Sequence, residues 1–497
     1  MSKMKEWENK IKMIRSQTPF RDFIKELASW MPIVLYKTQE GYLSRYPDTP
    51  RVAKKLSPKK YYQEVDDFIN RWIDVDFSIT FFENYKKLLQ VVPLLGRVCT
   101  MNAENSDFAE SVVNVKNVYL SYIVINGCEN VFYTFYAQDN SKDIFNSVMV
   151  WDHSQIVYFW VAIIKSYKIF YSRFIVDSNN IWFSTNLMWC SECIFCDGLE
   201  NKKYHIRNKE YSKEEYFTQK EKILQEREVY SSHYELLEKN AKNFASEKVQ
   251  GQFCVYSSNV QNGYFTYRLQ NARNVFFVGD KEGRKNVLDT LCSDDPWFGD
   301  IYASLNLWGA NNVYMVDCSV WQNLYYCHIC IDCSFCIGCT WLFNKQYCIL
   351  NKQYTKEAWN ELAPKIFAQM EKDGILWKFW PASMNPFYFN DTLAYLIDSS
   401  FTKQEVTQDG FMWRENEVKV DIPQTENVIS NQDLQKFQSF KNGKWKIDPT
   451  IVEKIIKDEK GNYYKILKEE FDFLSLHWLP LPELHWLERI RINLNFT

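Results

Sequence analysis

Glycine and histidine are scarce in this chain of 497 residues, and long apolar runs are missing. The sequence contains 15 glycines and six histidines, whereas aromatic residues make up 17%. Disordered and low-complexity chains are poor in aromatic residues, so this composition excludes those classes. The most apolar window, residues 156–164, ends at Lys165 and is far too short to span a bilayer.

Signs of export, of catalysis and of a strong bulk charge are also missing. Residues 1–16 are charged and contain no apolar core of a secretory signal, so we expect a cytoplasmic protein with reduced thiols. The net charge of −3 gives no global attraction to nucleic acid or to an anionic membrane. None of the six histidines lies in a nucleophile-elbow, HExxH or P-loop motif, which gives an enzyme little support.

What the chain does contain is a short phrase, a β-branched residue followed by an aromatic one, that recurs between residues 117 and 211. It is repeated every twelve or thirteen positions, at Val118, Val131, Ile144, Val157, Ile169, Ile181 and Ile194. A small hydroxyl residue usually comes three positions later. Asparagine or aspartate often comes just before, as a left-handed corner would require. A fixed period with aligned columns indicates stacked units that cannot bury a face alone.

The period selects the shape of the stack. Twelve or thirteen residues are too few for a helical repeat, but they suit one coil of a narrow β-solenoid with two short strands and two turns. The β-branched column would point inward, and the aromatic residues would form an outer ladder. An antiparallel sandwich is the alternative, although hairpins do not require one residue type at the same phase seven times in succession.

The phrase returns from residue 274 to residue 325 with looser spacing, and the two arrays close alike. Residues 193–198 match residues 333–338, and residues 201–214 match residues 344–357. We infer an internal duplication. After the first array, the sequence from Ser212 to Glu215 has the spacing of a capping box and predicts a helix.

The predicted fold class is therefore mainly β with α: two tandem narrow β-solenoids with flanking and linking helices. The predicted domains are an N-terminal helical region at 1–95, a first β-solenoid with its cap at 96–211, a helical linker at 212–250, a second β-solenoid with its cap at 251–354, and a C-terminal α/β region with a degenerate ribbon-like tail at 355–497.

Several motifs also resemble those of a known family. They are Trp72-Ile73-Asp74-Val75-Asp76-Phe77, Asn102-Ala103-Glu104-Asn105-Ser106, the Asn-Lys-x-Tyr-x-Ile-x-Asn-Lys-x-Tyr blocks that begin at Asn201 and Asn344, Pro381-Ala382-Ser383-Met384-Asn385-Pro386-Phe387, Gly461-Asn462-Tyr463-Tyr464-Lys465-Ile466 and Leu479-Pro480-Leu481-Pro482.

On these motifs the chain resembles uncharacterised cysteine-rich repeat proteins of candidate-phyla (Patescibacteria-type) bacteria, which are often labelled zinc-ribbon proteins. The resemblance covers most of the chain from about residue 46 onward. It implies a cysteine-rich repeat architecture and no established activity. The family's CxxC ribbons are missing, because no cysteine precedes Cys99 and none follows Cys348.

Two runs of cysteines are the candidate metal ligands. They consist of Cys190, Cys193 and Cys196, and of Cys327, Cys330, Cys333, Cys336 and Cys339. A two-residue gap is the spacing with which two thiolates reach one tetrahedral zinc ion. The alternative is that they are buried thiols in a solenoid core, which the phase of Cys327 favours because it matches that of Ser121. The Cys-Pro that ends an iron–sulfur motif is absent.

Lysines and tyrosines at the end of each array are the candidate binding residues. They are Lys202, Tyr204, Lys209, Tyr211, Lys345, Tyr347, Lys352 and Tyr354. Basic residues interleaved with aromatic ones can hold a nucleic-acid backbone. They can equally cover the open end of a solenoid, which needs a polar cap.

The function that the sequence favours is a non-enzymatic structural or protein-interaction scaffold with a protein partner and no membrane partner. The alternative is a zinc-containing nucleic-acid- or ribosome-associated factor, indicated by the family label and the lysine–tyrosine blocks. A glycan-acting β-helix enzyme is a third hypothesis. It would use paired carboxylates such as Asp139, Asp294 and Asp295, but no aligned carboxylate column supports it.

Overall fold

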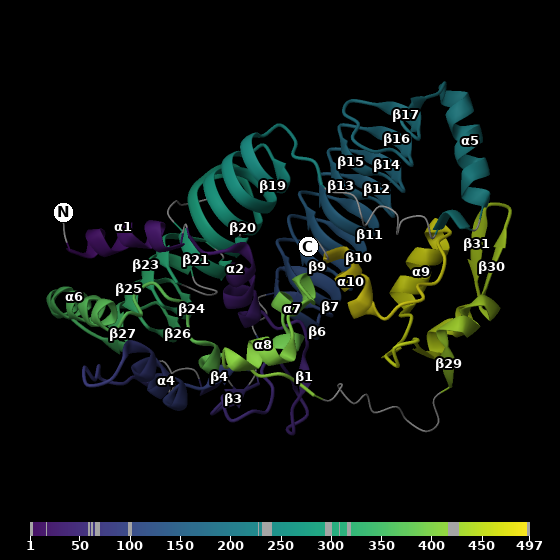
Figure 1. Cartoon of the computed structure of the whole chain (residues 1–497). Helices are drawn as coiled ribbons and strands as arrows, with labels where there is room; N and C mark the ends of the chain where they lie inside the picture. Colours follow the sequence, from purple (N-terminus) through teal and green to yellow (C-terminus); the bar gives the residue numbers. More distant parts are fainter. Residues whose placement is uncertain are drawn as a thin grey trace. The chain divides into compact units, whose positions relative to one another are not determined.

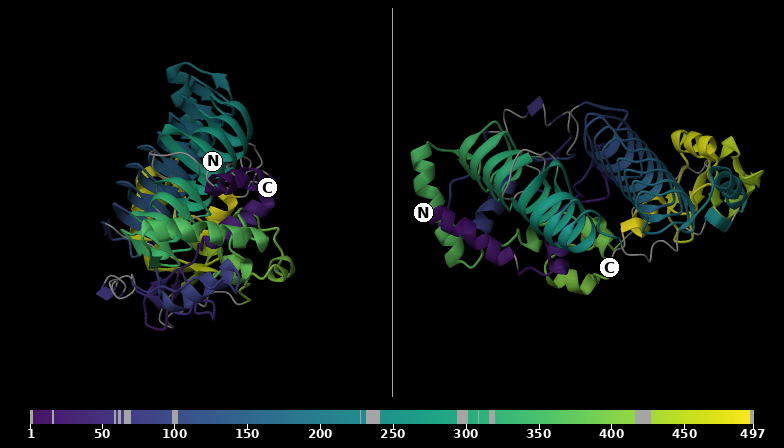
Figure 2. Two further views of the ribbon diagram at one scale, coloured as in Figure 1. Left: turned by 90° about the vertical axis from the view of Figure 1, so that its left-hand side faces the viewer. Right: turned by 90° about the horizontal axis from the view of Figure 1, so that it is seen from above.

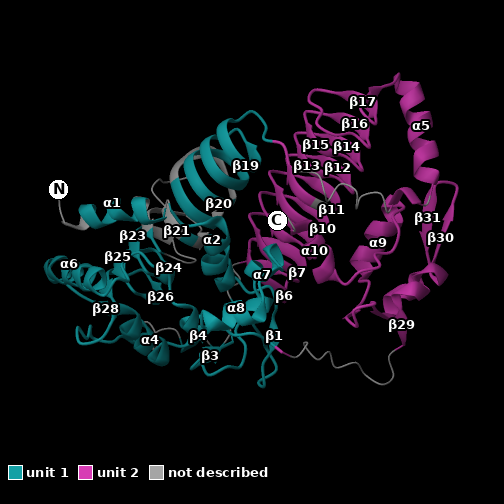
Figure 3. Cartoon of the chain, viewed as in Figure 1, with its two compact units in different colours: residues 1–97, 243–414, 497 teal, residues 98–242, 415–496 magenta. Residues whose placement is uncertain are grey.

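A computed structural model describes residues 3–15, 17–57, 60, 63–64, 70–97, 102–226, 228–230, 241–293, 301–307, 309–315, 320–415 and 427–494. The chain forms two compact units (Figure 1, Figure 3). Unit 1 contains residues 1–97 and 243–414, and unit 2 contains residues 98–242 and 415–496. Each unit is built on a narrow β-solenoid with helices beside it, which confirms the predicted fold class.

The units do not follow the order of the predicted domains along the chain. The N-terminal region predicted at 1–95 lies in unit 1 together with the second solenoid. The C-terminal region predicted at 355–497 is divided, because its part up to residue 414 belongs to unit 1 and the part from residue 415 belongs to unit 2.

The solenoid of unit 2 consists of short strands that pair in parallel from coil to coil, and Figure 2 shows the stacked coils from two further directions. The strands are β5 (Ala103–Glu104), β6 (Phe108–Val113), β7 (Val115–Ile125), β8 (Glu129–Phe132), β9 (Phe135–Ala137), β10 (Lys142–Trp151), β11 (Gln155–Ile164), β12 (Tyr167–Phe170), β13 (Arg173–Val176), β14 (Asn179–Trp182), β15 (Thr185–Met188), β16 (Ser191–Ile194), β17 (Lys203–Ile206) and β18 (Lys209–Glu210).

Each coil has four sides, not the two strands and two turns that the period suggests. Residues with a left-handed backbone recur at every third position, as at Asn117, Leu120, Ile123 and Asn126, whose φ angles are 54°, 43°, 57° and 59°. The residue after each corner points inward, so one coil supplies four buried columns. A left-handed residue that is not glycine costs roughly 1–2 kcal/mol, so the coil-to-coil bonds and the buried core must offset this strain.

One corner absorbs the difference between coils of twelve and thirteen residues. Val118 pairs with Val131, thirteen positions on, whereas Ile169 pairs with Ile181, twelve positions on. In the longer coils two successive residues at this corner have positive φ, as at Asn126 and Gly127. The extra residue is therefore taken up locally, and the inward columns stay in register.

Amide side chains stabilise another corner. Asn117 Nδ2 donates to Asn130 Oδ1 at 2.9 Å, and Asn130 Nδ2 donates to Asp143 Oδ1 at 2.8 Å. All three residues are left-handed, with φ angles of 54–57°. This confirms that the asparagine or aspartate before the repeated phrase occupies a corner. The side chains form a ladder along the stack in addition to tolerating the conformation.

The interior of the solenoid alternates apolar and hydroxyl columns. Val118, Val131 and Ile144 belong to an apolar column and are 0–1% exposed. In a neighbouring column, Ser172 Oγ donates to the carbonyl of Phe170 at 2.9 Å and accepts from the backbone N–H of Ser184 at 2.9 Å. Each serine thus bonds a carbonyl of its own coil and satisfies a buried N–H of the next coil. The carbonyl of Phe170 also accepts from the N–H of Phe183 at 3.1 Å, so the N–H of Ser184 is the group that would be costly to leave unpaired.

Outside the coils the aromatic residues stack as predicted. Phe132 and Phe145 lie 4.9 Å apart with their rings at 4°, and Phe170 and Trp182 lie 4.3 Å apart at 27°. Several of these rings are buried, because the C-terminal part of unit 2 covers them. That part consists of β29 (Val428–Ser430), η5 (Asn431–Lys436), β30 (Gln438–Lys441), β31 (Lys444–Ile447), η6 (Pro449–Glu453), β32 (Ile455–Lys457), β33 (Tyr463–Tyr464), α9 (Lys468–His477) and α10 (Trp486–Leu494).

A buried arginine fastens this cover to the solenoid. Arg489 of α10 is 1% exposed and donates to Asn146 Oδ1 at 2.7 Å, where Asn146 is a corner residue of β10. The same guanidinium pairs with Glu470 of α9 at 2.8 Å. Breaking a buried ion pair by removing one partner costs about 3–5 kcal/mol, so the bond resists release of the cover.

Unit 1 repeats this plan. Its solenoid runs through β19 (Glu247–Val255), β20 (Ser258–Ser293), β21 (Ile301–Leu307), β22 (Gly309–Tyr314), β23 (Val320–Tyr325), β24 (His328–Ile331), β25 (Cys333–Ile337), β26 (Thr340–Phe343), β27 (Gln346–Ile349) and β28 (Lys352–Gln353). Arg15 of an N-terminal helix pairs with buried Asp289, a left-handed residue of β20.

The other elements of unit 1 are helices and short strands at its two chain ends. They are α1 (Lys3–Arg15), α2 (Phe20–Leu27), η1 (Ala28–Trp30), β1 (Tyr36–Lys37), β2 (Leu43–Ser44), β3 (Lys55–Leu56), α4 (Phe81–Val91), β4 (Leu94–Leu95), α6 (Lys356–Lys372), η3 (Ala382–Met384), η4 (Phe389–Asp391), α7 (Leu393–Ile397) and α8 (Lys403–Gln408). In the part of the chain that the structure describes, no helix is long and apolar enough to cross a membrane.

Two half-buried histidines make the cover of unit 2 sensitive to pH. Burial lowers the pKa of His485 to about 4 with help from nearby Arg489, and burial lowers the pKa of His477 to about 4. The unfolded chain therefore binds more protons between about pH 6.5 and about pH 4. We predict that the stability of this cover falls as the pH drops through that window.

Hydrogen-exchange mass spectrometry on peptides from residues 463–494 measures this effect. Protection should decrease from about pH 7 to about pH 5 after correction for intrinsic exchange. The decrease should be smaller in His485→Asn, which retains an acceptor near the N–H of Leu487. The exposed His153→Asn is the matched control. Protection that is independent of pH in the unmodified chain would contradict the prediction.

Candidate functional site

The predicted cysteine ligands of unit 2 all point into the solenoid. Cys190, Cys193 and Cys196 are 1%, 0% and 1% exposed. They follow the corner residues Trp189, Glu192 and Phe195, whose φ angles are positive. Three successive inward positions of the coil are thus occupied by thiols, and the two-residue gap of the motif is the spacing of the corners.

The pairing of β14 with β16 corrects the predicted repeat at Ile194. Ile181 pairs with Cys193, and Trp182 pairs with Ile194, so the inward column of this coil contains Cys193 and not Ile194. The repeat there is twelve residues long. Ile194 was assigned to the inward column because it is β-branched like the other members of that column. Isoleucine is equally suited to an outward strand position, so residue type alone does not identify the inward residue. With the right register, Cys196 and not Asp197 continues the hydroxyl column.

In these columns the thiols make the hydrogen bonds that serines make in earlier coils. Cys196 Sγ donates to the carbonyl of Ile194 at 3.4 Å, and its backbone N–H donates to Ser184 Oγ at 3.0 Å. Ser184 Oγ itself donates to the carbonyl of Trp182 at 2.7 Å. The geometry is that of the buried-thiol alternative.

The second run forms a larger cluster at the closing end of unit 1. All its members are 0% exposed, and they are Cys327, Cys330, Cys333, Cys336, Cys339 and Cys348. Cys327 Sγ donates to Tyr325 O at 3.5 Å, and Cys339 Sγ accepts from the N–H of Asn351 at 3.4 Å. Burial raises the pKa of the Cys330 thiol well above its ordinary value, whereas hydrogen bonds with Cys330 and Cys336 lower the pKa of Cys333 to about 4.

A metal site requires a different arrangement of these groups. A zinc ligand must be a thiolate whose lone pairs face the ion, whereas these thiols donate protons to carbonyl oxygens. Among the residues that the structure describes, no three or more histidine, cysteine, aspartate or glutamate side chains are placed so that they could hold a metal ion. The thiols instead fill the core with groups of the size of serine and alanine.

The lysine–tyrosine block of unit 2 lies at the last coil. Strand β17 pairs with β18 in an antiparallel hairpin, after which the helix α5 (Lys213–Gln225) begins at the capping box predicted from Ser212 to Glu215. The ring of Tyr204 packs 5.6 Å from that of Tyr216 in α5. Lys202 and Lys209 are exposed, and Lys209 Nζ lies 5.5 Å from the ring of the half-buried Tyr211.

The matching block of unit 1 has the same construction. Strands β27 and β28 form an antiparallel hairpin, and α6 follows it. Tyr347 stacks on Phe335 at 5.0 Å, and the half-buried Lys345 lies one residue before β27. Lys352 Nζ is 2.5 Å from Asp74 Oδ1 and 5.6 Å from the ring of Tyr354. Each block therefore packs against the end of its own solenoid, and the two belong to different units.

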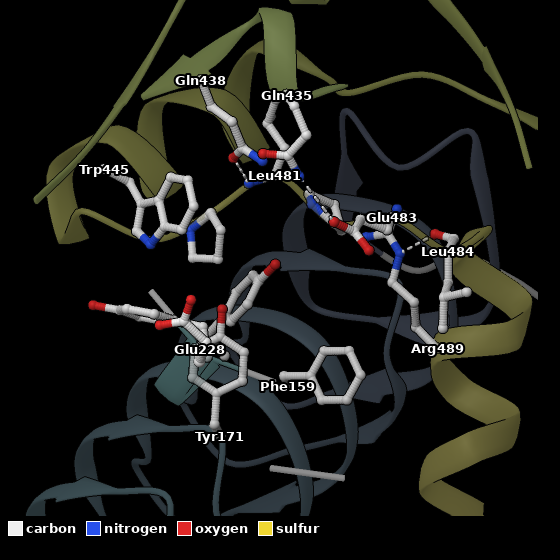
Figure 4. Close-up of a pocket in the computed structure, with 14 residues that line it drawn as sticks. Phe159, Tyr171, Glu228, Gln435, Gln438, Trp445, Leu481, Glu483, Leu484 and Arg489 are labelled. Atoms are coloured by element: carbon white, nitrogen blue, oxygen red, sulfur yellow. Dashed lines mark hydrogen bonds between the residues drawn. The ribbon is translucent and has the colours of Figure 1, made fainter. Parts of the chain in front are cut away.

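A cavity of unit 2 lies elsewhere, and none of the predicted binding residues is among its described lining residues. Its volume is about 300 Å³, at the lower end of the range of ligand pockets. It is lined by Tyr158, Phe159, Tyr171, Glu228, Tyr230, Gln435, Gln438, Trp445, Pro480, Leu481, Pro482, Glu483, Leu484 and Arg489. Figure 4 shows Phe159 and Tyr171 on the solenoid side, with Gln435, Gln438 and Trp445 on the opposite side.

The solenoid provides the floor of this pocket. Phe159 and Tyr171 are corner residues of successive coils, with φ angles of 62° and 49°, and their rings stack 6.1 Å apart. The signal in the sequence was a second aromatic residue directly after the first, as in Tyr158-Phe159 and Phe170-Tyr171. A corner directs both side chains outward, so such a pair marks a broad aromatic surface.

The C-terminal cover supplies the other wall through hydrogen-bonded loops. Gln438 Oε1 accepts from the N–H of Leu481 at 2.8 Å, and Tyr464 Oη donates to the carbonyl of Pro482 at 2.9 Å. Gln435 Nε2 donates to Glu483 Oε1 at 3.3 Å. These bonds hold residues 480–484 over the aromatic floor.

Comparison with known proteins identifies no relative: no family model matches the chain, and neither a curated protein nor a solved structure matches it. The resemblance to zinc-ribbon-labelled repeat proteins therefore stays a prediction.

We predict that the purified chain holds less than about 0.1 zinc ion per molecule, because the thiols serve as hydrogen-bond donors in the core. Elemental analysis of protein purified without chelator measures the content. Cys333→Ser with Cys336→Ser is the informative variant, since serine provides the same donor at both inward positions, and it should leave the metal content unchanged. Near-stoichiometric zinc that is lost in this variant would contradict the buried-thiol assignment.

Proposed function

We propose that this protein is a non-enzymatic scaffold that binds a protein partner, with the pocket of unit 2 as its attachment point. The observation that carries the proposal is a cavity of about 300 Å³ between an aromatic floor on the solenoid and a wall of hydrogen-bonded loops. Aromatic residues in such cavities are the usual anchors of binding energy at interfaces.

The construction of the pocket supports binding. Phe159 and Tyr171 project from coils whose corners and inward columns are bonded to the neighbouring coils on both sides, so the floor has little freedom to rearrange. A preorganised surface loses less conformational entropy when a partner binds. The buried Arg489 bond keeps the opposite wall in place.

The second candidate is the zinc-containing nucleic-acid- or ribosome-associated factor. What favours it is the concentration of six inward thiols at one end of unit 1, beside the Lys345 and Lys352 block. It requires the thiols to leave their carbonyl acceptors. We propose further that the two solenoids arose by internal duplication, which is supported by the matching order of hairpin, N-capped helix and closing coil in both units.

Site-specific crosslinking tests the proposed scaffold. A photoreactive residue placed at exposed Gln435, on the rim of the pocket, should crosslink a defined protein from a lysate of the source cells. The same residue at exposed Glu214 of α5 is the matched control and should not. The crosslinked protein, once identified and purified, should bind the unmodified chain and bind at least about tenfold more weakly to Gln438→Leu, in which the loop bond to Leu481 is lost.

The contrary result is equally clear. Equal labelling of the same proteins from positions 435 and 214, or a purified partner that binds the Gln438→Leu variant with full affinity, would show that the pocket is not the attachment point.

A further inference from the structure

The hairpin of β30 and β31, at one side of unit 2, carries lysines on one of its faces (Figure 1). Lys441 pairs with Lys444 across the two-residue turn of the hairpin. Because successive side chains of a strand point to opposite faces, Lys446 lies on the same face as Lys441 and Lys444. Phe440 and Trp445 lie on the other face, where Trp445 lines the pocket described above. The lysines therefore point away from that pocket.

The three lysines form a compact basic surface. All of them are exposed, and Lys444 and Lys446 lie about 7 Å apart along their strand. In the part of the chain that the structure describes, none of the three forms an ion pair with a carboxylate. Asp448 follows the hairpin, but it accepts from the N–H and the hydroxyl of Thr450 at 2.9 and 2.8 Å. This surface can attract anions although the net charge of the chain is −3.

An exposed tryptophan lies beside these lysines. Trp478 follows α9 and is 48% exposed, and Lys444 Nζ lies 3.7 Å from the centre of its ring. Since the ammonium group covers one face of the ring, exposure of this extent comes largely from the opposite face. Leu476, two residues earlier, is 70% exposed. The ring of Trp478 therefore offers a face to a second planar group.

The backbone of Trp478 has a conformation that is unfavourable for a residue with a large side chain. Its φ of 56° and ψ of 44° are left-handed, at the position after a helix where glycine is usual. A residue with a Cβ loses conformational energy there, and a half-exposed ring recovers only part of that loss by burial. Backbone outliers of this kind cluster at binding and active sites. The conformation is a second observation, independent of the charges, that points to a ligand.

Lysines beside an open aromatic face fit a single-stranded nucleic acid. Ammonium groups contact the phosphates, and a base stacks on the ring whatever its identity, because every base has a π-face. In a duplex the bases already stack on one another, so only a single strand uses both parts of the surface. An acidic peptide would contact the lysines but has no base to place on Trp478.

An anionic membrane fits this surface less well. Polybasic segments that bind such membranes contain about four to eight lysines or arginines, whereas the hairpin face has three. The exposed apolar side chains beside it are Leu476 and Trp478, which is little apolar area to insert between lipids.

We propose that the lysine face of the β30–β31 hairpin and the ring of Trp478 together bind single-stranded nucleic acid. Lys441, Lys444 and Lys446 contact successive phosphates, and one base stacks on the open face of Trp478. The proposal goes beyond the proposed scaffold. The two sites lie on opposite faces of the hairpin, so either can exist without the other.

Fluorescence anisotropy of labelled oligothymidylate with the full chain tests the proposal. The Kd should be about 100 μM or tighter at about 50 mM salt. The logarithm of the affinity should fall with the logarithm of the salt concentration with a slope of about −2, which is about 0.7 for each of three phosphate contacts. Oligouridylate of the same length is the second probe, and a preference for either oligomer supports the proposal and assigns DNA or RNA as the source.

Lysine variants locate the site. Lys446→Gln should make the slope shallower by about 0.7, and Lys441→Gln with Lys444→Gln and Lys446→Gln should remove most of the binding. The matched control removes three exposed lysines at the closing end of the same solenoid and should bind like the unmodified chain. It is Lys202→Gln with Lys203→Gln and Lys209→Gln.

Trp478→Gly separates binding from folding. Glycine suits the left-handed position, so the midpoint of thermal unfolding should stay the same or rise. The affinity for oligothymidylate should nevertheless fall about 5- to 150-fold, because the stacked base is lost. An abasic oligomer of the same length has no base to stack, so it should bind the variant and the unmodified chain equally.

Four results would overturn the proposal. They are no change in anisotropy up to about 0.3 mM chain, equal affinity of the unmodified chain for oligothymidylate and the abasic oligomer, equal affinity for oligothymidylate and polyglutamate of the same length, and binding that is lost in the control variant and retained in the hairpin variant. Co-sedimentation with vesicles of equal parts phosphatidylserine and phosphatidylcholine, without binding of either oligonucleotide, would assign the surface to a membrane and also overturn it.

Discussion

The structure depends on the hydrogen bonds that the narrow coil provides for the backbone groups in its own interior. A coil that turns at every third residue brings backbone groups close to its axis, where water cannot reach them. In unit 2 a column of serines solves this, since Ser172 bonds the carbonyl of Phe170 and accepts from the N–H of Ser184 in the next coil. Cys196 takes the same place at the end of the stack. A cysteine can therefore take the position that a serine takes in earlier coils.

The small and β-branched residues fill the inside of the coil, so the aromatic residues lie on its outer surface. The other segments of each unit pack against these rings. The outer rings must be covered, and in both units segments from distant parts of the chain provide the cover. Each cover is fastened by a buried arginine, Arg489 in unit 2 and Arg15 in unit 1, to a polar corner residue of the coil. In unit 2 the cover leaves a cavity above Phe159 and Tyr171, so the proposed binding site results from incomplete covering of a rigid surface.

Much of the solenoid could be predicted, because a short period aligns side chains that stack on their own equivalents. The apolar column through Val118 and Ile181 and the outer ring pairs were visible in this way. The four-sided coil was not, since corners at Leu120 and Phe159 carry residues that rarely adopt positive φ and give no local signal. The pocket was not predicted because it joins Tyr171 to Trp445, which are 274 positions apart in the sequence, and the paired aromatic residues of the floor do not show which segment lies opposite them.

The exchange of thiol for hydroxyl in one column is the central claim, and equilibrium unfolding of three Ser172 variants tests it most directly. The free energy of unfolding of Ser172→Cys should stay within about 1 kcal/mol of that of the unmodified chain. A thiol at this position can make the hydrogen bonds that Cys196 makes in the same column, in the coil after Ser184. Ser172→Ala should lose about 1–3 kcal/mol by leaving the N–H of Ser184 unpaired, and Ser172→Val should lose at least as much. Equal stability of the alanine and cysteine variants would contradict the account.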